Sequence, residues 1–172
     1  MPDGPRYDDD FYAWTQHQAE VLRTMRRVDN QLDREHLAEE IEDLGKSERN
    51  AVYSQIARIL EHFLKLAYSP AEPPRYGWMA SIVEARQALG RHLTPTLRNA
   101  ARQEFAALYR DACEMAAIRL REHREEAAAD ALPLMCPYTL EQVLERGWYP
   151  APKTVRGRAC QRAETRAPLL GR

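Results

Sequence analysis

Three polar side chains, Glu48, Gln55 and His62, recur every seven residues along one stretch of the chain, with Glu40 and Asp43 just before them. A spacing of seven places side chains on one face of a helix. A carboxylate, an amide and an imidazole on one face could bind a ligand, a metal ion or a proton. The same groups could instead bond to neighbouring helices and fix helix register. We favour this structural interpretation, because structural networks perturb polar groups as readily as active sites do.

The spacing of these groups does not match a metal or cofactor motif. Helical di-metal proteins display Glu-x-x-His on two helices, and the sequence contains neither Glu-x-x-His nor His-x-x-x-His. The nearest substitutes are Asp33-x-x-His36 and His36-x-x-x-Glu40, and Asp33 is predicted to cap a helix. We therefore predict no metal and no cofactor. A metal-dependent or acid/base enzyme that uses the inward carboxylates and His62 stays open as an alternative.

The C-terminal 22 residues, from Ala151 onward, form a second candidate site. This segment has six basic residues and one acidic residue, so its net charge is +5, and the preceding domain carries −6 of the total of −1. A basic tail can neutralise nucleic-acid phosphates. The candidate contacts are Lys153, Arg156, Arg158, Arg162 and Arg166. No aromatic reading element accompanies them, so a flexible tail that is solvated or pairs with its own acidic domain is favoured over nucleic-acid binding.

The polar line belongs to the longest proline-free run with a helical apolar period, from Asp33 to Tyr68. Asp33 is predicted to cap the first turn. The apolar stripe begins on Leu37, Ile41 and Leu44 and continues through Val52, Ile56, Ile59, Phe63 and Leu66. The two halves of this stripe point in different directions, and Gly45 is the position at which the helix can most easily absorb the change.

Shorter periodic segments flank this helix on both sides. One runs from Phe11 to Val28, and another places Trp78, Ile82, Ala85 and Leu89 inward. Thr94 followed by proline predicts a capped second long helix. Its predicted inward residues are Leu97, Ala101, Phe105, Leu108, Ala112, Met115 and Ile118, and a continuation into residues 125–129 stays open. Thr139 and Gln142 form a capping-box pattern for a short closing helix.

The fold class that follows is all-α, a single helical bundle with two long and several shorter helices. A chain of 172 residues predicts one domain, with residues 1–150 as the bundle and 151–172 as the basic, flexible tail. Three cysteines without Cys-x-x-Cys spacing, and no apolar leader or membrane-length apolar stretch, favour a cytoplasmic protein that does not enter membranes.

Five motifs carry a family resemblance: YDDDFYAWTQHQAEVLR, LDREHLAEEIEDLGKSER, LEHFLKLAY, the tryptophan of GWMASIVEAR, and CPYTLEQVL. In this order, over roughly Tyr7 to Pro150, the sequence resembles the all-helical bacterial family called domain of unknown function family twenty-nine, which is abundant in cyanobacteria. The resemblance implies a compact helical bundle and no particular activity. Members commonly have asparagine where this chain has His36, so the resemblance implies no site built on that histidine.

The leading functional prediction is a protein-interaction or scaffold module with an unknown protein partner. The two alternatives are the enzyme that uses the polar line and nucleic-acid binding through the tail. The sequence leaves the oligomeric state open.

Overall fold

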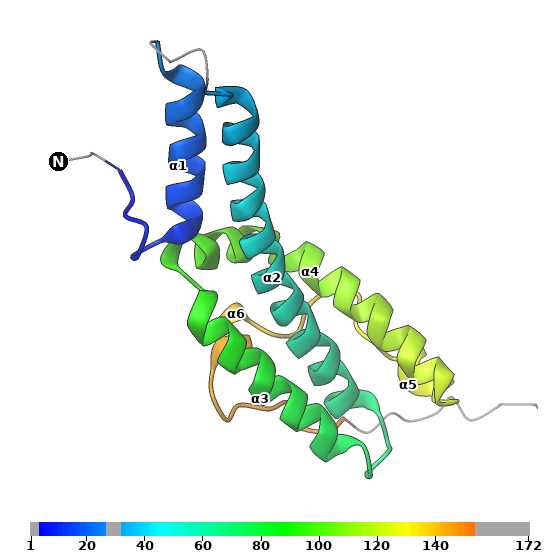
Figure 1. Ribbon diagram of the computed structural model, residues 1–172. Helices are drawn as coiled ribbons and strands as arrows, with labels where there is room; N and C mark the ends of the chain where they lie inside the picture. The colour runs from blue at the N-terminus through cyan, green and yellow to red at the C-terminus, as the bar shows by residue number, and fades with distance from the viewer. Residues whose placement is uncertain (1–3, 27–31, 154–172) are drawn as a thin grey trace, which may run out of the picture.

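The computed structural model describes residues 4–26 and 32–153, and within them it contains six helices and no strand. The helices are α1 (Phe11–Thr24), α2 (Arg34–Tyr68), α3 (Arg75–His92), α4 (Pro95–Glu122), α5 (Glu126–Asp130) and α6 (Leu140–Leu144). The predicted all-α fold with two long helices, α2 and α4, is confirmed (Figure 1).

Local signals place the helix starts as the sequence predicts. The Asp33 carboxylate accepts a hydrogen bond from the His36 amide at the start of α2. Thr94 caps α4, and Pro95 occupies its first position. Thr139 and Gln142 form both hydrogen bonds of a capping box at α6. Each cap satisfies amides that the first helical turn leaves without a carbonyl partner, which contributes about 1 kcal/mol.

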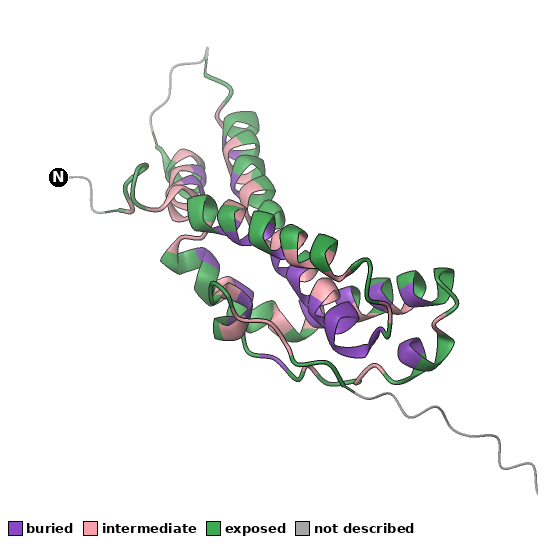
Figure 2. Cartoon of the chain, turned by 90° about the horizontal axis from the view of Figure 1, so that it is seen from below, coloured by how far each residue is buried: buried purple, intermediate pink, exposed green. Residues whose placement is uncertain are grey.

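The core is built around the C-terminal half of α2, which packs against α3 and α4. Val52, Ile56, Ile59, Phe63 and Leu66 are all buried, as their spacing predicts. Figure 2 shows the buried positions gathered towards this end of α2. The second half of the predicted stripe is therefore the centre of the bundle.

The prediction that the first half of the apolar stripe faces the core is wrong for its two leucines. Leu37 and Leu44 are exposed, with 40% and 55% of their surface accessible, whereas Ala38 and Gly45 are buried. The reason is the close approach of α1: a Cβ atom added at Gly45 would overlap the Oγ1 atom of Thr15. Two helices this close leave room only for small residues between them, so the larger leucines lie to one side.

Helix α1 and the first part of α2, residues 11–24 and 34–45, form a two-helix arm. They lie side by side and antiparallel, away from α3, α5 and α6 (Figure 1). Arg23 of α1 pairs with Glu42 of α2, and Arg34 donates to the Met25 carbonyl. At the base of the arm, the Thr96 amide donates to Asp10 Oδ2 at 3.3 Å, which attaches the arm to the start of α4.

Helix α4 also departs from its predicted pattern. The sequence pattern predicts that Met115 and Ile118 face inward, but they are exposed by 43% and 50%, and Ala116 and Leu120 are buried instead. The buried face of α4 turns because α5 packs against its end. The helix ends at Glu122 and does not continue into residues 125–129, because Arg124 adopts a left-handed conformation with φ of 62°.

Candidate functional site

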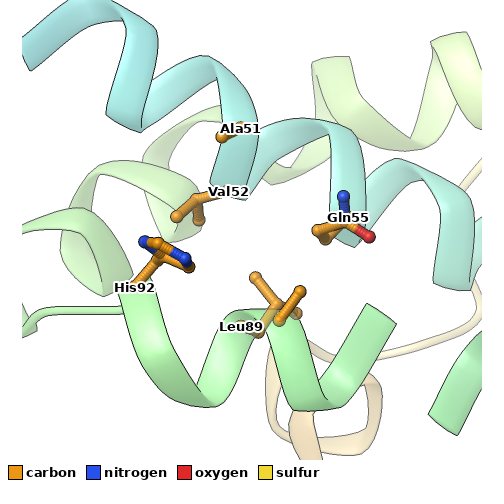
Figure 3. A pocket seen from close by; sticks show the side chains of 6 residues that line it. Ala51, Val52, Gln55, Leu89 and His92 are labelled. Atoms are coloured by element: carbon orange, nitrogen blue, oxygen red, sulfur yellow. The ribbon is translucent and has the colours of Figure 1, made fainter. Parts of the chain in front are cut away.

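A small cavity between α2 and α3 collects part of the predicted polar line. It has a volume of about 120 Å³ and is lined by Ala51, Val52, Gln55, Ala88, Leu89 and His92. In Figure 3, His92 and Gln55 stand at opposite ends, with Val52 and Leu89 between them. Next to the cavity, His92 Nδ1 lies 2.7 Å from Glu48 Oε1. The structure thus places Gln55 in the wall of the cavity and Glu48 beside it. The residue that links Glu48 to the cavity is His92, which the sequence pattern does not predict as part of a site.

The chemistry of this cavity is limited by its size and its lining. About 120 Å³ holds only a few water molecules, since one water occupies about 30 Å³ in the liquid. Ligand pockets are usually about 300–1,000 Å³. A hydrogen-bonded imidazole–carboxylate pair beside a small, mostly apolar cavity fits a link between α2 and α3 better than a substrate site.

The other carboxylates of the line lie apart from this cavity. Glu40 and Asp43 are exposed on α2, and Asp43 accepts a hydrogen bond from Lys46 Nζ at 2.9 Å. Within residues 4–26 and 32–153, no three His, Cys, Asp or Glu side chains come together as a group that could hold a metal ion. The predicted polar residues therefore do not converge on one centre.

His62 occupies a separate, half-buried position one turn before Lys65. Burial lowers the pKa of His62 to about 4, and the nearby Lys65 charge acts in the same direction. Its Nδ1 atom is buried and has no hydrogen-bond partner among the described residues. The imidazole is therefore neutral at pH 7, and it contributes to packing more than to proton transfer.

This lowered pKa predicts a pH-dependent loss of stability. An unfolded histidine binds a proton below pH of about 6.5, whereas folded His62 stays neutral down to about 4. The unfolded state then binds more protons, so stability falls as the pH drops through this window. We expect His62→Gln to flatten the dependence of unfolding free energy on pH between about 6.5 and 4. Urea titrations across this range measure it.

His123→Gln is the matched control, since His123 is exposed at the C-terminal end of α4. A slope that is unchanged in His62→Gln, or reduced equally in both variants, would contradict the burial of a neutral imidazole at residue 62.

Only the first residue of the predicted nucleic-acid contact is described by the structure. The Lys153 amide donates to the Ala67 carbonyl at 2.7 Å, and Lys153 Nζ donates to the Tyr68 hydroxyl at 3.0 Å. Lys153 is thus held against the end of α2. Arg156, Arg158, Arg162 and Arg166 lie outside the described residues, and nucleic-acid contact through them stays a prediction.

Exposed apolar side chains gather on one side of the arm. Two of them, Leu37 and Leu44, are predicted by the sequence pattern to lie in the core. On α1, buried Thr15 and Ala19 mark the line that faces α2. At about 100° per residue, Val21 and Met25 fall on one side of this line and Arg23 on the other. Both apolar residues are exposed.

The first part of α2 has the same arrangement. Relative to buried Ala38 and Gly45, Glu42 lies on one side at about 100° per residue, and the apolar residues lie on the other. These are Leu37, Ile41 and Leu44. Because Arg23 pairs with Glu42, the charged sides of both helices form one face of the arm. Val21, Met25, Leu37, Ile41 and Leu44 therefore share the opposite face, which we call the apolar arm face.

Fold and surface together define a class: an all-helical bundle whose projecting two-helix arm has one apolar and one charged face. No helix in the described residues has an apolar stretch that could cross a lipid bilayer. The chain belongs to the family described as "Domain of unknown function DUF29", whose sequence profile matches residues 6–149. The family resemblance read from the motifs is thereby confirmed.

A solved structure shares this architecture. The crystal structure of an alpha-helical protein of unknown function from Rhodospirillum rubrum is 28% identical in sequence, with a TM-score of 0.74. The similarity covers 85% of this chain and 93% of that one. No curated protein matches the chain.

Proposed function

We propose that this protein is a cytoplasmic protein-interaction module, and that the apolar arm face is its docking surface. One observation carries the proposal: four of the five large apolar side chains on one face of a projecting arm are exposed and the fifth, Ile41, is half-buried, while the other face of the arm is charged. Clustered exposed apolar residues are typical of protein-interaction sites, whereas scattered ones are ordinary.

The arm offers a larger apolar set than other exposed positions in the described chain. Leu134 and Met135 are highly exposed, but they are two neighbouring residues in the loop before α6. Met115 and Ile118 are a pair on α4. The arm presents the spacing of four and three residues with which helices recognise one another.

A photocrosslinker in the full-length protein tests the docking function in cells. With benzoylphenylalanine at Leu44, we expect a discrete higher-mass adduct, because a docked partner lies against this side chain. The same probe at Ile118, which is exposed to a similar degree on α4, serves as the matched control. Leu37→Asp in the Leu44 probe protein should abolish the adduct, since it places a charge in the same surface. Equal adducts at both positions, or none at Leu44, would contradict the proposal.

A further inference from the structure

The apolar arm face has the form of half a four-helix bundle. Two antiparallel helices form a single layer, and such a layer buries an apolar face only against another layer. Within the arm, the contact between α1 and α2 is made by small residues such as Thr15, Ala19 and Gly45. The large apolar side chains are thus left free to form the core of a second, wider interface.

The apolar arm face begins where α3 stops covering α2. Helix α3 covers α2 at Val52 and Gln55 and ends at His92, which pairs with Glu48. Leu44 is one turn further towards the N-terminus of α2, and from there the same side of the helix is uncovered. The apolar arm face therefore continues an interface that already exists between α2 and α3.

The charges around the apolar arm face allow it to pair with the same face of a second copy. Besides Val21 and Met25, the α1 side chains next to this face are also uncharged: Gln18, Leu22 and Trp14, which packs against Tyr7. Of the nearest acidic groups, Glu40 lies at the α2 edge, and Glu48 lies on the same side as Leu37 but at the base of the arm, where His92 engages it. Placing two copies face to face therefore brings no like charges together at the centre, whereas pairing through the opposite face would take the Arg23–Glu42 ion pair out of water.

We propose that the partner of the apolar arm face is a second copy of this chain, so that two arms pair about a two-fold axis into a four-helix bundle. This inference rests on the proposed docking function. In an isologous pair each patch meets its own equivalent, so one apolar face suffices for both partners.

The dimensions of the arm limit the surface area that two paired copies can bury. Fourteen residues of α1 span about 21 Å at 1.5 Å per residue, and two helices side by side are about 20 Å wide. The face is thus on the order of 400 Å² per copy, or about 800 Å² for the pair, which is below the roughly 1,200–2,000 Å² of stable specific interfaces and is the size of a weak, transient one. The dimer is therefore reversible and depends on concentration.

Sedimentation velocity of the full-length protein over a series of concentrations tests the pairing. The wild type should shift from monomer to dimer as concentration rises. Leu44→Asp and, separately, Leu37→Asp should weaken the dimer by on the order of tenfold or more, because each would bury an unpaired carboxylate. Ile118→Asp on α4 should leave the dissociation constant unchanged. Circular dichroism of each variant verifies that it is folded, which is expected for changes at exposed positions.

Three results would overturn the pairing. They are a wild type that stays monomeric at the highest attainable concentration, a dimer that both arm variants retain, and a dimer that Ile118→Asp weakens equally. The mass of the Leu44 photocrosslink separates this failure from failure of the docking function. An adduct of twice the chain mass supports pairing with a second copy. An adduct of another mass contradicts the pairing and supports docking of a different partner. The absence of any adduct contradicts both the pairing and the docking function.

Discussion

Replacing Phe63 with alanine is expected to lower the free energy of unfolding by about 3–5 kcal/mol. Phe63 is completely buried in α2. Its ring centroid lies 5.3 Å from that of Tyr138 and 5.0 Å from that of Trp148, both in edge-to-face geometry. The Arg86 guanidinium lies 5.5 Å from the same ring. Alanine would leave a cavity where the central helix meets the closing segment around α6.

Urea denaturation followed by circular dichroism measures this loss. Met115→Ala is the matched control, because the sequence pattern places Met115 in the core and the structure places it on the surface. We expect that variant to change the unfolding free energy by no more than about 0.5 kcal/mol. Equal losses in the two variants would show that the surrounding core is packed differently.

The parts of the fold that the sequence predicted correctly are those that depend on local signals. The caps at Asp33, Thr94 and Thr139 each involve residues three positions apart, so their chemistry is visible in a short window. The buried side of α2 from Val52 to Leu66 is likewise visible, because large apolar residues alone define it.

The arm could not be predicted in this way, because hydrophobicity alone does not show how closely two helices approach. Leu37 and Leu44 have the spacing of core residues, and yet Gly45 lies against Thr15, which is thirty positions earlier in the chain. Small residues at this crossing decide which side of α2 meets α1. Gly45 therefore serves close packing, and the leucines become surface residues.

The candidate site shows the same limit. A spacing of seven residues correctly places Glu48, Gln55 and His62 on one side of α2, but consecutive members are about 10 Å apart along the axis. Their surroundings therefore come from other helices. Glu48 meets His92, which is 44 positions away, whereas buried His62 Nδ1 has no partner in the described chain. No local pattern distinguishes these outcomes.

Arg86 is the buried cation that joins α3 to the closing segment, and its replacement by methionine is expected to cost about 2–4 kcal/mol. The guanidinium donates from Nε to the Val143 carbonyl at 2.9 Å, and from one terminal nitrogen to the Gln142 and Trp148 carbonyls at 3.1 and 3.0 Å. Burial lowers the pKa of Arg86. The three carbonyls replace part of the water that the guanidinium loses, while its Nη1 atom is buried without a partner among the described residues. Methionine fills much of the volume and donates nothing, so three acceptors lose their partner.

Denaturation and hydrogen exchange together test this role of Arg86. The amides of α6 should exchange faster in Arg86→Met, because the carbonyls around them are no longer bound to α3. Arg86→Lys should fall between wild type and methionine, since an ammonium keeps the charge and lacks the planar fork that reaches several acceptors. The control is Arg102→Met, which removes an exposed ion pair of 2.9 Å to Glu141 of the same α6 helix. Exposed pairs contribute about 0–1 kcal/mol, so a loss at Arg102 as large as that at Arg86 would mean that the closing segment is held by surface charge and not by the buried guanidinium.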